Sequence, residues 1–137
     1  MVGILIVAHG AFGEALIHCA SHVLGKRPLR VRQVGITVHD DPDAILPQAQ
    51  DLVRQLDEGD GVLVLTDLLG ATPSNVAARL EARGRVEVVA GVSLPMLVRA
   101  LTYRAQPLAA VVEKAMSGGR EGVVHIGAAA THATTGS

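Results

Sequence analysis

Aromatic side chains are almost missing from this chain. Its 137 residues include no tryptophan, and Phe12 and Tyr103 are its only aromatic residues. Bases and sugar rings commonly bind by stacking on aromatic side chains, so this mode of binding is nearly excluded. The net charge is −1, and the Lys and Arg residues form no basic stripe. We therefore expect no nucleic-acid partner.

Cysteine and long apolar segments are equally scarce. Cys19 is the single cysteine, so an internal disulfide is impossible, which fits a reducing cytoplasm. No segment approaches the roughly 20 apolar residues of a membrane span. The N-terminal stretch lacks the positive region of a signal peptide and is interrupted by His9, Glu14 and His18. These features predict a cytoplasmic protein.

The chain is instead rich in aliphatic residues, and its hydrophobic content is 49%. Apolar runs alternate with amphipathic segments along the sequence. The runs predict strands over about residues 2–8, 31–38, 61–66 and 86–90. The amphipathic segments predict helices over about residues 10–24, 41–56, 73–82, 94–104 and 108–117. This alternation predicts an α/β fold with a doubly wound, mostly parallel sheet flanked by helices.

The C-terminal part departs from that alternation. Residues 122–126 form a short apolar segment after two successive helices, and we predict a last strand there. It would lie antiparallel at a sheet edge or pair with another subunit. We expect residues 1–127 to form one domain, and the small residues of 128–137 to form a mobile tail.

His9 is the first candidate for chemistry. It ends an apolar run typical of a strand buried on both faces, and ligands gather at the carboxyl ends of such strands. Asp67 follows a second run of this kind, so adjacent parallel strands would bring the two side chains together. A carboxylate that accepts a hydrogen bond from one ring nitrogen leaves the other as a nucleophile or base. His9 and Asp67 are therefore the candidate catalytic residues.

A loop of small and hydroxyl residues follows Asp67 and leads into a helix, and helix N-termini favour anions. The candidate phosphate-binding residues are Gly10, Gly70, Ala71, Thr72 and Ser74. The two hydroxyl residues could instead cap the helix that starts at residue 73. The chain lacks both a Walker lysine and a GxGxxG motif after the first strand. A phosphoryl group received by His9 itself therefore fits better than a bound nucleotide.

Other candidate ligands have simpler interpretations. His18 and His22 are spaced for one face of a helix and could bind a metal, but no third ligand accompanies them, and we interpret them as exposed helix residues. Cys19 falls on the apolar face of the same helix and is predicted to be in the core. Asp67 could also serve only as a turn or cap residue. We expect no metal site and no cofactor.

Four motifs together resemble a known family. They are His9-Gly10, residues 67–75 (DLLGATPSN), residues 90–97 (AGVSLPML) and residues 119–123 (GREGV). The chain resembles the IIA component of the mannose family of the bacterial phosphoenolpyruvate-dependent sugar phosphotransferase system, over about residues 1–126.

The resemblance implies a phosphohistidine carrier. His9 would accept a phosphoryl group from HPr and pass it to a IIB partner in sugar uptake, or to a regulatory target. Asp67 would orient the imidazole and Thr72 would hydrogen-bond the phosphoryl group. The family also implies a homodimer that exchanges the last strand, and membrane contact only indirectly, through a permease.

Two positions depart from the family pattern, and two other functions remain open. Leu69 stands where the family usually has an aromatic residue, at the rim where a partner would dock. Ala71 replaces a usual second glycine and would be restricted if that position required a positive φ. The alternatives are a phosphotransfer subunit of a dihydroxyacetone kinase and a chelatase-like metal-handling enzyme. The latter needs a second metal-binding His or Glu facing His9.

Overall fold

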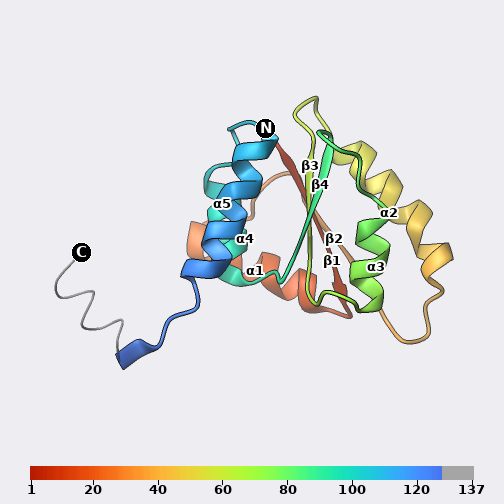
Figure 1. The fold of residues 1–137 in the computed structure, drawn as a ribbon, viewed down its shortest axis with the longest axis horizontal. Coiled ribbons are helices and arrows are strands. Elements are labelled where there is room, and N and C mark those ends of the chain that lie inside the picture. Colours follow the sequence, from red (N-terminus) through yellow and green to blue (C-terminus); the bar gives the residue numbers. More distant parts are fainter. Residues whose placement is uncertain (128–137) are drawn as a thin grey trace.

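A four-stranded parallel sheet forms the centre of the molecule (Figure 1). The computed structural model describes residues 1–127. Within them the strands are β1 (Gly3–His9), β2 (Val31–Ile36), β3 (Val62–Thr66) and β4 (Val86–Ala90), arranged in the order β2-β1-β3-β4. All three pairings are parallel. The predicted α/β sheet is therefore confirmed, with the two most apolar strands adjacent at its centre.

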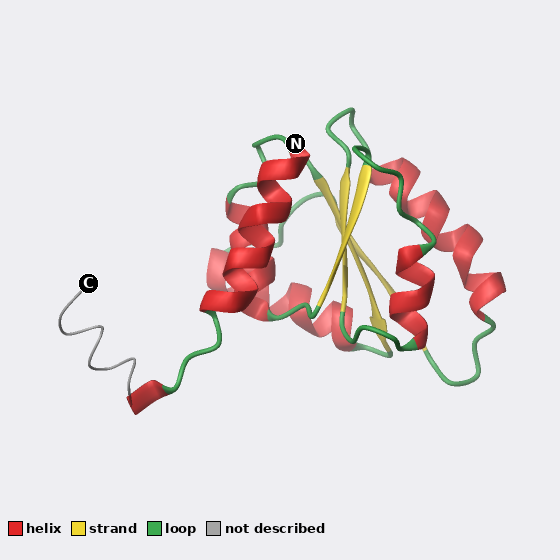
Figure 2. Ribbon diagram, in the orientation of Figure 1, coloured by secondary structure: helices red, strands yellow, loops and turns green. Residues whose placement is uncertain are grey.

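Five helices cover the two faces of this sheet (Figure 2). Helices α1 (Phe12–Leu24), α4 (Leu94–Thr102) and α5 (Leu108–Glu121) lie on one face. Helices α2 (Pro42–Leu56) and α3 (Thr72–Ala78) lie on the other. None of the helices within residues 1–127 is long and apolar enough to cross a membrane.

The central strands are buried on both faces, which explains their continuous apolar sequences. In β1, Ile4 and Ile6 belong to the core under α1, α4 and α5, whereas Leu5 and Val7 belong to the core under α2 and α3. Side chains of β3 alternate in the same way. Each fully buried aliphatic side chain contributes about 1.5–3 kcal/mol. The carboxyl ends of β1 and β3 therefore lie next to each other in a well-packed sheet.

Several element boundaries differ from prediction. Strand β2 ends at Ile36, and Val38 beyond it is 94% exposed. Helix α3 ends at Ala78, four residues early. Helix α5 instead continues past Ser117 to Glu121, because its glycines allow a close approach to α4. A Cβ atom at Gly118 would lie 2.9 Å from that of Arg99.

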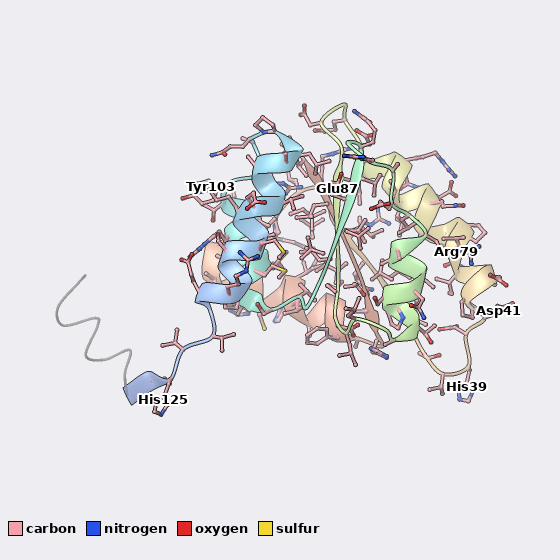
Figure 3. The ribbon with its side chains drawn as sticks, viewed as in Figure 1. His39, Asp41, Arg79, Glu87, Tyr103 and His125 are labelled. Atoms are coloured by element: carbon pink, nitrogen blue, oxygen red, sulfur yellow. The ribbon has the colours of Figure 1, made fainter. Side chains whose placement is uncertain are left out.

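The prediction of a last strand over residues 122–126 is wrong for the single chain. Residues 122–127 form no strand within this chain, and the segment leads away from the body beyond α5, with His125 well outside it (Figure 3). Val123 and Ile126 are 86% and 80% exposed. A strand needs a neighbour to accept its backbone hydrogen bonds, and the segment pairs with no strand among residues 1–127. Exchange with a second chain stays a prediction. The predicted tail, residues 128–137, lies outside the described residues.

Candidate functional site

His9 and Asp67 meet at the carboxyl edge of the sheet, as predicted. Strands β1 and β3 are adjacent and parallel, with Val7 opposite Thr66, so His9 and Asp67 follow within two residues of this pair at the same edge of the sheet. Nδ1 of His9 lies 2.7 Å from Oδ2 of Asp67. The same oxygen accepts a 2.9 Å hydrogen bond from the backbone N–H of His9. The ring is thus fixed at Nδ1, and Nε2 is left free.

Asp67 is well placed to remain a carboxylate. Its side chain is only 14% exposed, and its Oδ1 accepts a 2.8 Å hydrogen bond from the backbone N–H of Leu68. Burial by itself would raise the pKa of this carboxyl. The hydrogen bonds from the backbone and ring of His9 and from Leu68 outweigh burial, so the pKa of Asp67 is lowered. An ionised Asp67 holds the Nδ1 proton and directs the lone pair of Nε2 outward.

The imidazole itself is accessible. The side chain of His9 is 55% exposed, in contrast to its carboxylate partner. An accessible nucleophile that is oriented by a buried carboxylate suits reaction with a group carried by a second molecule.

The chain next to His9 is held by β2. Gly10 has φ +50° and its N–H donates a 3.0 Å hydrogen bond to the carbonyl of Ile36. A Cβ atom at Gly35 would lie 2.1 Å from the carbonyl oxygen of Gly10, so position 35 requires glycine. Sequence analysis missed Gly35, although a glycine inside a strand is a known signal of close backbone approach.

Two helices begin next to this pair. Helix α1 starts after Ala11 and α3 starts after Ala71, both without a side-chain hydrogen bond to their first turn. By contrast, Asp41 and Ser93 cap α2 and α4; α5 starts uncapped, after Pro107. The first-turn N–H groups of α1 and α3 are therefore open to an anionic ligand.

The predicted phosphate-binding residues separate into two groups. Gly10 and Gly70 provide positive φ angles in the two turns after β1 and β3, and Thr72 is exposed at the first position of α3. Ala71 has φ −83° and ψ 168°, an extended conformation open to any residue, so its replacement of glycine causes no strain. Ser74 is only 5% exposed and lines a separate hollow beside β4 with Thr66 and Glu81, to which His9 does not contribute.

Other polar residues at this edge have structural roles. Asp41 accepts a hydrogen bond from the backbone N–H of Asp43 and starts α2. His39 is exposed in the preceding loop (Figure 3). Residues 1–127 contain no group of three or more His, Cys, Asp or Glu side chains that could hold a metal ion. The chelatase hypothesis therefore finds no such group around His9 in this part of the chain.

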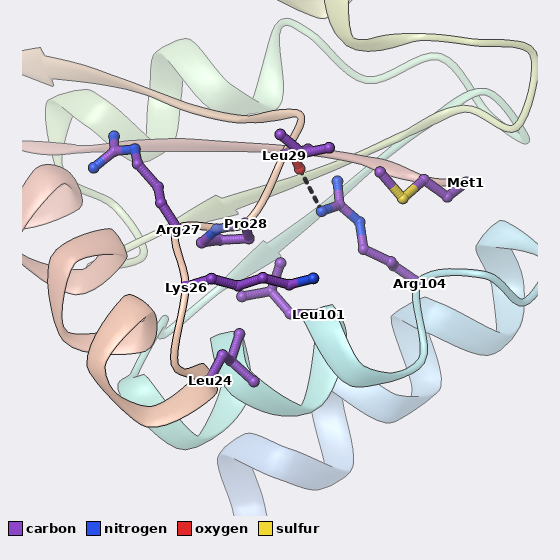
Figure 4. A pocket seen from close by; sticks show the side chains of 8 residues that line it. All are labelled: Met1, Leu24, Lys26, Arg27, Pro28, Leu29, Leu101 and Arg104. Atoms are coloured by element: carbon purple, nitrogen blue, oxygen red, sulfur yellow. Dashed lines mark hydrogen bonds between the residues drawn. The ribbon is translucent and has the colours of Figure 1, made fainter.

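A larger hollow lies away from His9, where β1 begins (Figure 4). Its volume is about 500 Å³, and its walls include Leu101 and Arg104. The Arg104 guanidinium donates to the carbonyls of Val2, Leu29 and Arg30 at 2.6–3.0 Å, and burial lowers its pKa. This cation ties the start of β1 to the loop before β2, and its role is structural.

Comparison with known proteins decides the family. A family model described as the PTS system fructose IIA component matches residues 3–116. The chain belongs to this family. The predicted resemblance to a mannose-family IIA component is confirmed, and the chain is a IIA component of the sugar phosphotransferase system.

Individual relatives of this IIA component agree with that assignment. It is 32% identical over 125 residues to the PTS system mannose-specific EIIAB component of Escherichia coli, covering 89% of this chain and 38% of that protein. It is 29% identical over 105 residues to the PTS system fructose-specific EIIA component of Bacillus subtilis, covering 76% of this chain and 71% of the relative.

A solved structure agrees as well. The phosphotransferase system component EIIA from Streptococcus agalactiae matches with a TM-score of 0.83 and 28% identity, covering 93% of this chain and 99% of that one. The chain spans little more than a third of the Escherichia coli relative, 38% of its length. The comparisons favour neither the dihydroxyacetone kinase subunit nor the chelatase.

Proposed function

We propose that this IIA component is a phosphohistidine carrier, in which Nε2 of His9 accepts a phosphoryl group from HPr and passes it to a IIB partner. The observation that carries the proposal is the 2.7 Å contact between Nδ1 of His9 and Asp67. It fixes the proton on Nδ1 and leaves Nε2 as the only nucleophilic atom of an accessible ring.

The transfer is a direct displacement at phosphorus. The lone pair of Nε2 attacks the phosphorus carried by the donor's histidine, a new N–P bond forms, and the donor's N–P bond breaks with its electrons returning to the donor ring. The imidazole of His9 becomes cationic, with its proton still on Nδ1. The carboxylate of Asp67 stabilises that cation, and the reverse step passes the group onward.

The surrounding backbone would hold the phosphoryl oxygens. The open first turns of α1 and α3 supply N–H groups, and the Thr72 hydroxyl supplies a further donor. Gly10 and Gly70 shape the two turns that bring these groups toward His9. Ser74 would act only by supporting the loop, because it is buried on the β4 side.

Exposed apolar residues around the site suit docking of protein partners. Leu68 and Leu69 in the loop after β3 are 63% and 80% exposed, and Phe12 is exposed at the start of α1. Partners that carry the phosphoryl group would bury this rim during transfer. Leu69, in place of the aromatic residue usual in the family, would affect which partner binds. The carrier would work in the cytoplasm and reach the membrane only through a permease.

The single domain of residues 1–127 would act as a homodimer. The segment beyond α5 exposes Val123, Val124 and Ile126. Residues 123–125 lie in no helix or strand, and their backbone could extend the sheet of a second copy. This pairing would supply the neighbour that the segment lacks in the single chain.

The test is the intact mass of the chain after incubation with phosphoenolpyruvate, enzyme I and HPr. We expect one acid-labile phosphoryl group on the native chain and none on His9→Ala. His39→Ala, an exposed histidine at the same edge, is the matched control and should be phosphorylated normally. Phosphorylation of the His9→Ala chain would refute the assignment of His9.

A further inference from the structure

The exposed face of α1 carries a second pair of titratable side chains, well separated in sequence from His9. Nε2 of His18 and Nε2 of His22 lie 3.3 Å apart, and their ring centroids are separated by 4.8 Å. Both rings are exposed. We propose that His18 and His22 form a bidentate binding site for a divalent transition-metal ion such as Zn²⁺.

The distance between the two ring nitrogens fits a metal chelate. Zinc binds histidine nitrogen at about 2.0–2.1 Å in tetrahedral geometry, which places two such nitrogens about 3.3–3.4 Å apart. The observed separation of 3.3 Å falls in this range. Both rings already converge through Nε2, so an ion could replace the hydrogen bond between them with little movement of either side chain.

The surroundings leave room for the ion and its remaining ligands. A hollow of about 280 Å³ is lined by His18, Ser21, His22 and Gly25. Gly25 has no side chain to close it, and the Ser21 hydroxyl donates to the carbonyl of Ile17. Water or another external ligand can therefore complete the coordination.

The helix itself favours a cation at this place. His22 lies in the last turn of α1, which ends at Leu24, and the negative end of the helix dipole attracts positive charge. Two imidazole nitrogens without a carboxylate select a borderline transition metal over Mg²⁺ or Ca²⁺, which prefer oxygen ligands. The chemistry of this site is thus distinct from that of His9 and Asp67.

Two other side chains of α1 could bind a metal. Glu14 lies one turn before His18 and is paired with Arg27 at 3.0 Å. Cys19 is exposed, so the prediction that it lies in the core is wrong. It stands one residue from His18 but does not line the hollow. A test of the proposal must therefore separate a histidine chelate from a thiolate site.

The experiment is calorimetric titration of Zn²⁺ into the untagged full chain after removal of metal by a chelator. We expect one ion per chain. Alanine at either His18 or His22 should weaken binding roughly tenfold or more, because a single imidazole loses the effective concentration of its partner. Both positions are exposed on a helix, where alanine is a good helix former, so both variants should fold.

The controls are His39→Ala, His125→Ala and Cys19→Ser, which should bind as the native chain does, and excess Mg²⁺, which should not compete. Imidazole resonances of His18 and His22 should shift together on addition of Zn²⁺. The proposal is overturned if the native chain binds no Zn²⁺ up to about 1 mM, or if binding depends on only one or neither of the two histidines. Loss of binding in Cys19→Ser or in His9→Ala would likewise place the ion elsewhere and overturn it.

Discussion

Replacing Asp67 by asparagine tests the central contact of the site while keeping the shape of the side chain. The carboxylate has three hydrogen-bond donors around it. Oδ2 accepts from the ring and backbone of His9, and Oδ1 accepts from Leu68. An amide has only one oxygen that can accept these hydrogen bonds. In either orientation its NH₂ group therefore faces an N–H donor of His9 or of Leu68.

Both orientations of the new amide are harmful, for different reasons. With its oxygen toward His9, the amide keeps the tautomer but loses the negative charge that stabilises the cationic ring. A hydrogen bond to a charged group exceeds a neutral one by about 1–2 kcal/mol, or roughly 5- to 30-fold in rate. With its NH₂ group toward His9, the amide favours the tautomer protonated at Nε2, which cannot attack phosphorus. We therefore expect phosphorylation to slow at least about fivefold.

The assay is rapid quenching of transfer from phosphorylated HPr to the chain. Asp40→Asn is the matched control, since Asp40 also accepts a backbone hydrogen bond, from Thr37, at the same sheet edge but makes no contact with His9. Its rate should match that of the native chain. A native rate in Asp67→Asn, with the fold intact, would refute the orienting role of the carboxylate.

The same substitution has a pH signature in stability. The pKa of Asp67 is lowered by the hydrogen bonds from His9 and Leu68, which outweigh burial. A lowered carboxyl pKa gives stability that is fully present above the unfolded pKa of about 3.9 and is lost as pH falls through the folded value. The difference in unfolding free energy between the native chain and Asp67→Asn should thus shrink below about pH 4, as urea titrations would show.

Two glycine positions give further predictions. Gly35→Ala should cost about 1–3 kcal/mol in unfolding free energy and slow phosphorylation, because the new methyl group would collide with the carbonyl of Gly10. In Gly127→Ala the nearest atom among residues 1–127 would lie 3.9 Å from the new methyl group, and this variant should be neutral. Equal stability of the two variants in urea would contradict the close contact at Gly35. Ala71→Gly, which restores the usual family residue, should lower stability by about 0.5–1 kcal/mol, because Ala71 is already extended; a gain in stability would show that alanine is strained there.

The sequence was sufficient for much of the fold because its central strands are buried on both faces. The continuous runs of β1 and β3 admit few other structures, and glycine and proline mark most of the turns between elements. The predictions for the end of α5 and for residues 122–126 were wrong, because tertiary contacts override the local sequence signals there. The helix predicted over residues 108–117 continues to Glu121, where Gly118 packs closely against Arg99. The segment with Val123 and Ile126 has strand-like composition but pairs with no strand among residues 1–127.

By itself, the sequence determined that His9 ends one buried strand, that Asp67 follows another, and that a loop of small residues adjoins Asp67, because those features are local. Only the tertiary structure decided that β1 and β3 are neighbours, that Nδ1 rather than Nε2 meets the carboxylate, and that Ser74 faces away toward β4. Strand order, ring orientation and side-chain direction depend on packing between segments distant in the chain, and no local pattern encodes them.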